Sequence, residues 1–328
     1  MAGTIAVIGS NCFTGCHIVD ALLARGETVV GISRSRQYNQ LFLPYADRDL
    51  ARFSFHQIDM VKDFDRLVRL LDECRAKTVI HVAALSEVGL SNERPVEYFE
   101  TNTLAVVKLC HHLRTCGYLR HYIHISSAEI LGSCEEPVRE EALYNPSTPY
   151  AVSKAAADMF IDTLVQNFDF PATLIRSTNV YGRHQQLFKI IPRTAIYLKL
   201  GKRVELHGGG LSSKCFVHVR DVVDGLLAAF EQGKTGTFHF SVPSDITIAE
   251  IVRIVCEEMG QSFEDNTAVV GERLGQDARY VLDCTKARDQ LGWEARVDFC
   301  AGVREVIDWV EANWDQVRRE PLEYQHKV

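Results

Sequence analysis

Few features interrupt this 328-residue chain. Its 9 prolines form no Pro-rich linker, and there is no internal repeat or low-complexity tract. No apolar run reaches the roughly 20 residues that a membrane span needs. Met1-Ala2-Gly3 leads directly into an apolar strand pattern, with no signal peptide before it. We therefore expect a cytoplasmic protein without a membrane partner.

Charge of one sign is not concentrated anywhere in the sequence. The 36 Lys and Arg against 43 Asp and Glu give a net charge of −7, and neither kind forms a block. Nucleic-acid surfaces are basic, so we expect no nucleic-acid partner. A hydrophobic content of 46% is ordinary for a globular protein, and the length allows one large or two modest domains.

The 10 cysteines are scattered, and no C-x-x-C pair occurs. Most lie in apolar helix or strand patterns, which favours buried, reduced thiols over disulfides or zinc ligands. The histidines, including His81, His124 and the pair His111-His112, show no metal-ligand spacing. The sequence therefore predicts no metal site.

A glycine turn follows the first predicted strand. Thr4–Ile8 is short and apolar, the segment 9–15 follows it, and an amphipathic helix continues to about Arg25. A turn of this kind lets a dinucleotide diphosphate approach the backbone and the helix N-terminus. Cys12 stands where a middle glycine is expected, so an ordinary strand-to-helix turn stays an alternative. The predicted cofactor contacts here are Gly9, Asn11, Cys12, Phe13, Thr14 and Gly15.

The end of the second predicted strand bears on the choice of cofactor. An NAD site usually has a carboxylate here for the ribose 2′-hydroxyl. This chain has Ser33, Arg34 and Arg36, which suit a 2′-phosphate. We expect NADP, with NAD as the alternative; Arg34 and Arg36 as solvated loop residues are the other interpretation.

Further strands and helices alternate along the chain. Strands are predicted over 53–60, 78–84, 122–127 and 172–178, and helices over 63–76 and 95–116. This alternation predicts a doubly wound parallel sheet with ligands at the carboxyl ends of its strands. Additional cofactor contacts are expected from Asp59, which could bind the adenine amino group, and from Met60, Val82, Ala83, Ala84, Asn102 and Ile125.

Residues 145–154 carry the most distinctive pair. Pro149 suits the first turn of a helix, with Ser147 or Thr148 as its cap. Tyr150 and Lys154 then lie four residues apart on one face. A nearby ammonium favours the phenolate, so we expect a lowered pKa for Tyr150 and a role as general base. A surface pair that happens to be four apart is the alternative.

Together these segments resemble the extended short-chain dehydrogenase/reductases of the NDP-sugar epimerase/dehydratase superfamily, over essentially the full length. The resemblance is strongest to dTDP-glucose 4,6-dehydratases, with some features of GDP-mannose 4,6-dehydratases. It rests on the glycine turn and on segments 81–84, 100–102, 179–182, 189–192, 273–280 and 291–293, with Tyr150 and Lys154. It implies a Rossmann-like fold, a nucleotide-diphosphate sugar substrate, and a homodimer paired through helices 95–116 and the Tyr150 helix.

The resemblance also implies roles for the segment after the fifth strand. Ser127 would hydrogen-bond the sugar 4-hydroxyl beside Tyr150, and Glu129 would remove the C5 proton. Ala128 replaces the aspartic acid that protonates the departing 6-hydroxyl in such dehydratases, and Leu131 replaces a common Tyr. Glu129 or a water must then serve as the acid, or the reaction is not a dehydration. A solvated loop carboxylate is the other interpretation of Glu129.

A smaller C-terminal α/β region is expected to bind the nucleotide sugar. We divide the chain into residues 1–178, which bind NAD(P), and residues 179–328, interleaved with the first part. The resemblance implies a diphosphate or sugar contact from Asn179, a nucleoside pocket lined by Phe188, and phosphate contacts from Lys189, Lys214 and Arg273. Ser86 and His207 complete the predicted substrate contacts.

The expected activity is therefore that of an NAD(P)-dependent nucleotide-sugar 4,6-dehydratase, a lyase whose cofactor is recycled through a 4-keto intermediate. An NDP-sugar 4-epimerase, which needs no C5 base, and an NDP-glucuronate decarboxylase are the alternatives. A different class is a non-catalytic NADP-binding sensor, against which the presence of Ser127, Tyr150 and Lys154 argues.

Overall fold

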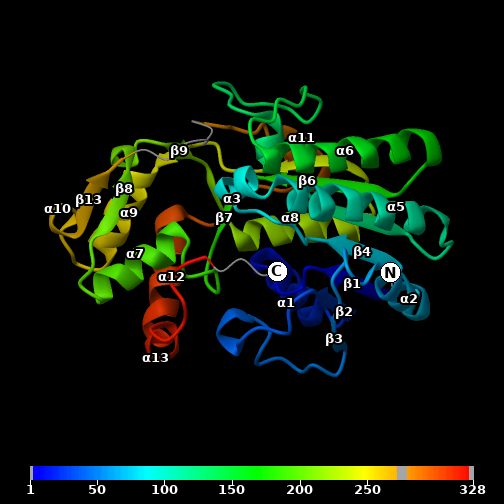
Figure 1. Ribbon diagram of the computed structural model, residues 1–328, viewed down its shortest axis with the longest axis horizontal. Coiled ribbons are helices and arrows are strands. Elements are labelled where there is room, and N and C mark those ends of the chain that lie inside the picture. The colour runs from blue at the N-terminus through cyan, green and yellow to red at the C-terminus, as the bar shows by residue number, and fades with distance from the viewer. Residues whose placement is uncertain (1–2, 272–278, 325–328) are drawn as a thin grey trace.

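The computed structural model describes residues 3–271 and 279–324. Its centre is a parallel seven-stranded sheet in the order β11-β6-β5-β4-β1-β2-β3 (Figure 1). The strands are β1 (Thr4–Ile8), β2 (Thr28–Ser33), β3 (Phe53–Gln57), β4 (Thr78–His81), β5 (His121–Ile125), β6 (Ala172–Ser177) and β11 (Gly236–Phe240). The predicted Rossmann-like, doubly wound sheet is confirmed, and the chain reverses direction across the sheet between β1 and β4.

Helices cover both faces of this sheet. They are α1 (Phe13–Ala24), α2 (Phe64–Cys74), α5 (Ala105–Thr115), α6 (Pro149–Phe168), α8 (Val219–Glu231) and α11 (Thr285–Leu291). Alternate residues of β1 face opposite sides of the sheet. Ile5 and Val7 pack with α1, α8 and α11 on one face. Ala6 and Ile8 pack with α2, α5 and α6 on the other. This alternation is the two-residue period of a strand buried on both faces.

The carboxyl edge of the sheet differs from the prediction in detail. Strands β3 and β4 end at Gln57 and His81, three residues earlier than expected, and the chain continues as loops. Ile8 accepts hydrogen bonds from the N–H groups of both Val82 and Ala83, which bends the chain after β4 out of the sheet. The loops free the following side chains to face a ligand rather than a neighbouring strand.

The helix predicted over 95–116 is divided. It consists of α4 (Pro95–Phe99), a π-helical turn η2 (Glu100–Leu104) and α5. Asn102 lies in the π turn, and its side chain accepts from the backbone N–H of Leu85 and donates to the carbonyl of Leu85. The irregular turn therefore braces the loop after β4.

A second group of elements lies beside the sheet (Figure 1). Its core is formed by α7 (Ile190–Lys199), β8 (Val204–His207), α9 (Ile248–Glu258) and α12 (Phe299–Ala312). Short elements complete the fold: α3 (Val88–Glu93), α10 (Phe263–Asn266), α13 (Trp314–Val317), β7 (Asn179–Tyr181), β9 (Ser213–Lys214), β10 (Phe216–His218), β12 (Ile246–Thr247) and β13 (Thr267–Val270), with η1 (Gln40–Phe42), η3 (Ala128–Leu131) and η4 (Gly208–Gly210).

Two whole-chain properties bear on the sequence-based expectations. None of the helices in the described ranges is long and apolar enough to cross a membrane. No disulfide links any of the ten cysteines, all of which lie in the described part of the chain.

Candidate active site

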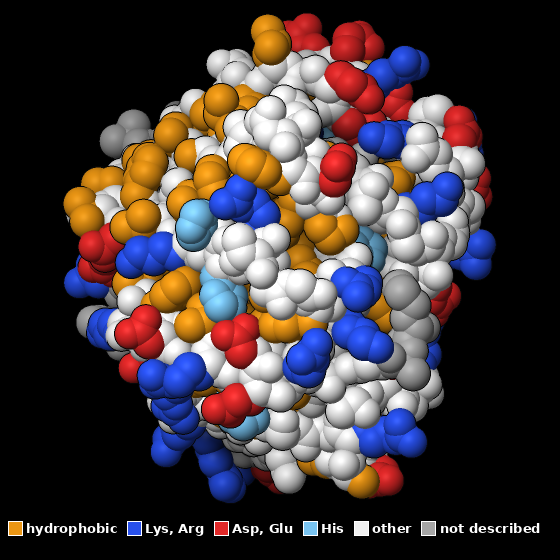
Figure 2. Space-filling view, turned by 90° about the vertical axis from the view of Figure 1, so that its right-hand side faces the viewer, with side chains coloured by type: hydrophobic (Ala, Val, Ile, Leu, Met, Phe, Trp, Pro, Cys, Tyr) orange, Lys and Arg blue, Asp and Glu red, His pale blue; other side chains and the backbone are white. Residues whose placement is uncertain are grey.

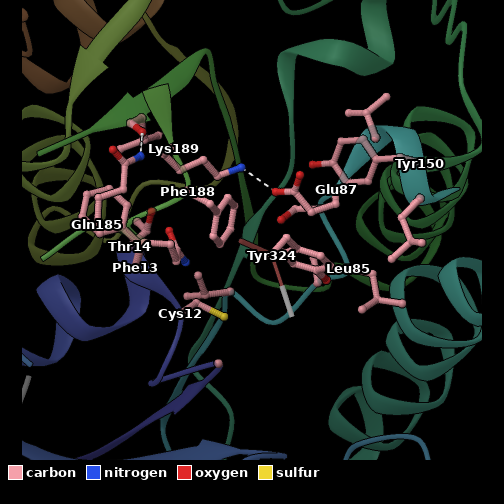
Figure 3. Close-up of a pocket in the computed structure, with 18 of the residues that line it drawn as sticks. Cys12, Phe13, Thr14, Leu85, Glu87, Tyr150, Gln185, Phe188, Lys189 and Tyr324 are labelled. Atoms are coloured by element: carbon pink, nitrogen blue, oxygen red, sulfur yellow. Dashed lines mark hydrogen bonds and ion pairs between the residues drawn. The ribbon is translucent and has the colours of Figure 1, made fainter. Parts of the chain in front are cut away.

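A cleft of about 1500 Å³ separates the carboxyl edge of the sheet from the second group of elements. The glycine turn, the loops after β2 to β5, and the start of α6 form one wall. The segment 184–191, His207, Lys214 and the C-terminal residues 320–324 contribute to the other. In Figure 3 the glycine turn lies at one end and Tyr150 at another, with Tyr324 between them.

The glycine turn shapes the cofactor end of the cleft. Gly9 has a φ of +94°, and a Cβ there would lie 2.5 Å from the amide nitrogen of Ala83. A Cβ on Gly15 would overlap the carbonyl oxygen of Gly9, so this glycine serves the packing of α1 on β1. No side chain among the described residues caps α1, and Phe13 and Thr14 of its first turn line the cleft. The residues present therefore fit a bound diphosphate.

Asn11 ties the turn to the loop after β2. Its backbone N–H donates to Ser33 Oγ at 3.0 Å, and its side-chain amide donates to the carbonyl of Arg36 at 2.9 Å. Arg34 lines the cleft, as predicted. Arg36 is exposed and is not among the described lining residues.

The other predicted cofactor residues fall into two sets. Asp59, Met60, Val82, Ala83, Ala84 and Ile125 line the cleft. One carboxylate oxygen of Asp59 accepts from the backbone N–H of Val61, which fixes the loop after β3. Gly15 and Asn102 are not among the lining residues. Gly15 packs against the backbone of Gly9, and Asn102 hydrogen-bonds the backbone of Leu85, so both support residues that line the cleft.

Tyr150, Ser127 and Glu129 meet at one end of the cleft. Pro149 begins α6 and Thr148 Oγ1 accepts from the N–H of Ala151, so the predicted cap places Tyr150 in the first turn. Ser127 Oγ accepts from the N–H of Glu129 at 3.2 Å and also hydrogen-bonds Tyr150, which lowers the pKa of the phenol. Ser127, which caps η3, thus hydrogen-bonds both Glu129 of η3 and Tyr150 of α6.

The expected fall in the pKa of Tyr150 is wrong for the chain as described. Burial, followed by the negative charge of Glu129, raises that pKa well above the ordinary value of 10. Lys154 is not among the main influences on that pKa, and its Nζ donates to the carbonyl of Ile125 at 2.7 Å. Burial lowers the pKa of Lys154 itself to about 8, against the opposing charge of Asp158.

Ala128 faces away from the chemistry. It is buried and packs with Ile130, Leu131, Ala155, Tyr280 and Leu282, and it is not among the described lining residues. The side chain next to Glu129 therefore provides packing and no proton-transfer group. Position 128 therefore differs from the expected aspartic acid in residue type, and its side chain also lies outside the cleft lining.

The substrate wall contains an ion pair that the sequence-based prediction missed. Lys189 Nζ lies 2.5 Å from Glu87 Oε1, across the cleft in Figure 3. Phe188 packs edge-on against Tyr324, with ring centroids 5.4 Å apart. Glu87 follows the predicted Ser86 on the loop after β4, where its position could have marked it. Tyr324 lies in the C-terminal segment, where no motif points to the cleft.

The remaining predicted substrate residues also line the cleft where the structure describes them. These are Ser86, Asn179, His207 and Lys214. Asn179 donates to Tyr280 Oη at 3.3 Å, and Lys214 Nζ lies 4.7 Å from the centroid of the Tyr280 ring. Arg273 lies outside the described residues. Two lysines, each close to an aromatic ring (Lys189 to Phe188 and Lys214 to Tyr280), therefore line the cleft.

Comparisons with known proteins agree with this geometry. The model of the family described as GDP-mannose 4,6 dehydratase matches residues 7–306. A human dTDP-D-glucose 4,6-dehydratase is 30% identical over 266 residues, covering 77% of this chain and 75% of its own. A dTDP-glucose 4,6-dehydratase from Streptomyces antibioticus is 32% identical over 255 residues, covering 75% and 74%.

Solved structures give the same result for the fold. A dTDP-glucose 4,6-dehydratase from Streptomyces venezuelae with NAD bound is 27% identical, with a TM-score of 0.87 over 95% of this chain and 98% of its own. A UDP-glucose 4-epimerase from Thermus thermophilus in complex with NAD is 26% identical, with a TM-score of 0.85 over 94% and 99%. The chain therefore belongs to the GDP-mannose 4,6-dehydratase family, within the nucleotide-sugar dehydratases and epimerases of the short-chain dehydrogenase/reductase superfamily.

Proposed function

We propose that this protein is an NAD(P)-dependent nucleotide-sugar 4,6-dehydratase. The observation that carries the proposal is the meeting of Ser127, Glu129 and Tyr150 at one end of the cleft, with the open N-terminus of α1 at the cofactor end. These groups supply a hydroxyl to orient the sugar, a carboxylate and a phenol. Dehydration through a 4-keto sugar uses all three.

Tyr150 and Ser127 act on the sugar 4-hydroxyl. Ser127 hydrogen-bonds both the phenol and the sugar, and Tyr150 takes the hydroxyl proton as hydride leaves C4. NAD(P)⁺ held at the glycine turn would supply the hydride acceptor for the first half of the reaction and the hydride donor for the last. Because burial raises the pKa of Tyr150, the ammonium of Lys154 has to offset part of the cost of forming the phenolate.

Glu129 acts in the second half of the reaction. A 4-keto group acidifies the C5 hydrogen by resonance, and the Glu129 carboxylate removes it while water leaves from C6. Its proximity to the phenol is consistent with this role, since its charge acts on Tyr150. Ala128 provides no acid, so Glu129 or a water protonates the departing hydroxyl.

For the cofactor, we propose a preference for NADP over NAD. The loop after β2 presents Ser33 and Arg34 to the cleft and has no carboxylate at this point. A guanidinium stabilises a 2′-phosphate through charge-assisted hydrogen bonds, whereas an NAD site relies on an acidic residue.

For the substrate, we propose a nucleotide-diphosphate sugar held mainly by residues 179–328, with residues 1–178 holding the cofactor. Lys189 and Lys214 line the wall where a diphosphate would bind, and Arg273 is proposed as a further contact. Lys189 is paired with Glu87, so phosphate binding must exchange one anionic partner for another. Glu87 is thereby left facing the sugar end of the cleft.

A second candidate is an NDP-sugar 4-epimerase, and Ala128 is the observation that favours it. An epimerase needs Tyr150, Lys154 and Ser127 but no C5 base and no acid for a leaving hydroxyl. In that case Glu129 would be a binding residue. The choice between the two reactions therefore depends on whether C5 loses its hydrogen.

We propose that the protein is a cytoplasmic homodimer. Exposed apolar side chains gather on α4, η2 and α6, including Val96, Leu104 and Met159, and an apolar groove runs along α4, η2 and α5. Figure 2 shows hydrophobic side chains over the left and the centre of the face in view, with charges of both signs among and around them. A second copy presenting the same helices would cover them. The disulfide-free thiols suit a reducing compartment.

The proposal is tested by incubating the purified protein with NADP or NAD and a panel of nucleotide hexoses and uronates, followed by mass analysis of the products. Loss of one water from a hexose supports the dehydratase. An unchanged mass with an altered sugar favours the epimerase, and loss of carbon dioxide from a uronate favours a decarboxylase. No turnover of any substrate, together with cofactor binding, would favour the non-catalytic sensor.

A further inference from the structure

A chain of buried polar groups lies behind Tyr150 and Lys154. His81 on β4 and His124 on β5 are adjacent in the sheet, and their Nδ1 atoms are 3.1 Å apart. His124 Nε2 lies 3.2 Å from Lys154 Nζ. Both imidazoles are shielded from solvent, with relative exposures of 1% and 0%. The two histidines therefore connect the catalytic helix to the middle of the sheet.

The protonation states of the two rings follow from these contacts. An ammonium has only donors, so His124 Nε2 must accept from Lys154. Burial, followed by the charge of Lys154, lowers the pKa of both histidines, that of His81 to about 3, so both are neutral. His124 then carries its hydrogen on Nδ1 and donates it to His81 Nδ1. His81 in turn carries its own hydrogen on Nε2.

This arrangement leaves one buried nitrogen without a hydrogen bond. His81 Nε2 is buried and has no hydrogen-bond partner among the described residues. A buried polar atom without a partner destabilises a fold, and a leucine at this position would avoid the cost. Tyr122 Oη lies 3.3 Å from His124 Nδ1 and offers that nitrogen a second contact. The pair is therefore poorly explained as core packing alone.

The other charged group that acts on Lys154 is Asp158. Asp158, one helical turn further along α6, is fully buried, and burial raises the pKa of its carboxyl. It accepts from Ser126 Oγ at 2.9 Å and from Arg176 Nε at 3.2 Å. Asp158 Oδ1 is 3.9 Å from His124 Nε2, so it supplies charge near the ammonium. Lys154 Nζ donates to the Ile125 carbonyl at 2.7 Å and to His124 Nε2 at 3.2 Å.

We propose that His124, in the tautomer fixed by His81, is a positioning residue that holds the ammonium of Lys154, which lies one helical turn after Tyr150 on α6. His124 touches neither sugar nor cofactor and acts through Lys154 alone. Its orientation depends on His81, which presents an acceptor to its Nδ1. The inference rests on the proposed function only in that Tyr150 and Lys154 carry the first proton transfer. It is independent of which sugar is bound and of whether water is lost.

The tautomers are tested directly in the native protein with ¹⁵N-labelled histidine. We expect the ¹⁵N spectrum to show His124 protonated on Nδ1 and His81 protonated on Nε2, both unchanged from pH 6 to pH 7. A hydrogen on His124 Nε2, or a charged His124 in that range, would overturn the proposal. Because no substrate is needed, this result stands even if no nucleotide sugar is turned over, an outcome that would count against the proposed function instead.

The role in catalysis is tested with His124→Leu and a matched His124→Gln, whose side-chain oxygen can replace Nε2 as acceptor. Loss of the acceptor destabilises the ammonium, so we expect Lys154 in His124→Leu to lose its proton about one pH unit lower. The alkaline limb of kcat should move down equally, with kcat about fivefold lower at pH 8, where the native ammonium is itself half titrated, and KM little changed. His124→Gln should restore most of both.

The ¹³C resonance of Lys154 Cε reports its titration without turnover, and circular dichroism checks that each variant is folded. An unchanged Lys154 titration in folded His124→Leu would overturn the proposal. So would a His124→Gln variant that is folded and yet behaves like His124→Leu, because an acceptor would then make no difference. If His124→Leu does not fold, the comparison of native protein with His124→Gln and the tautomers of the native protein decide the matter.

Discussion

At Tyr150, burial and the negative charge of Glu129 both raise the pKa of the phenol, against the hydrogen bond from Ser127, and burial is the largest effect. The sequence shows the favourable partner, Lys154, because a spacing of four is visible in a linear pattern. It does not show the desolvation of the phenol or the approach of Glu129, since both depend on how the loop after β5 folds. The structure also shows how Ser127 connects these groups: its Oγ accepts from the N–H of Glu129, and its side chain hydrogen-bonds Tyr150.

The loop after β2 yields a prediction about single residues. Arg34 lines the cleft and Arg36 is exposed beyond it. Arg34→Ala should weaken NADP binding more than NAD binding, by roughly 1 to 3 kcal/mol, because a charge-assisted hydrogen bond is lost. Arg36→Ala is the matched control and should change either affinity little. Calorimetry with both cofactors measures this.

The same calorimetric titration is carried out with the native protein. Tighter binding of NAD than of NADP would contradict the assignment of the loop. An equal loss in the two arginine variants would mean that Arg36 also reaches the 2′-phosphate, despite its exposed position.

Individual elements were predictable to the extent that their signals are local. Pro149 and the cap at Thr148 gave the start of α6 from sequence, and the apolar run 4–8 gave β1 without error. The early ends of β3 and β4 and the π turn at Asn102 were not predictable, because they arise from hydrogen bonds between segments distant in sequence. Tyr324 was missed for a similar reason, since only the fold brings it to Phe188, whereas Glu87 could have been marked by its position beside Ser86.

The β1–α1 unit allows a test at the level of an element. Gly15→Ala should push α1 away from β1, because the added methyl overlaps the carbonyl oxygen of Gly9. Overpacking of this kind costs about 1 to 3 kcal/mol and here should also abolish cofactor binding. Gly271→Ala is the control, since its Cβ meets nothing within 4 Å. Denaturant unfolding and cofactor titration together measure both effects; unchanged cofactor affinity in folded Gly15→Ala would contradict the account.

Assembly is a property of the whole molecule. If α4, η2 and α6 pair with a second copy, Leu104→Glu should convert a dimer to a monomer at micromolar concentration, because a charge would be buried without a partner. Leu211→Glu, at a position 77% exposed on the other side of the cleft, should leave the dimer intact. Light scattering decides the matter. A native monomer would exclude the proposed interface.

The buried histidines make stability depend on pH. Burial lowers the pKa of His81 and His239 to about 3 and that of His121 to about 4. Between these values and the ordinary 6.5, the unfolded chain binds protons that the native chain does not. Stability is therefore full above about pH 6.5 and falls as the pH decreases.

From pH 7 to pH 5.5, the free energy of unfolding should drop by roughly 1 kcal/mol for each deeply buried histidine, of which His81 and His124 are the clearest cases. Urea unfolding at the two pH values measures this. A constant or rising free energy of unfolding toward pH 5.5 would mean that the histidines are not neutral in the native state.

The central claim is that Glu129 removes the C5 hydrogen of a 4-keto sugar, and hydrogen exchange at C5 tests it most directly. The native enzyme, given its nucleotide hexose in deuterated water, should form a product that has lost one water and carries deuterium at C5. Glu129→Gln should still reduce the cofactor in a single turnover but leave C5 unlabelled, because an amide is not a base at neutral pH. If the native enzyme turns over its sugar without ever exchanging C5, Glu129 is not the C5 base, and the epimerase becomes the better account of this cleft.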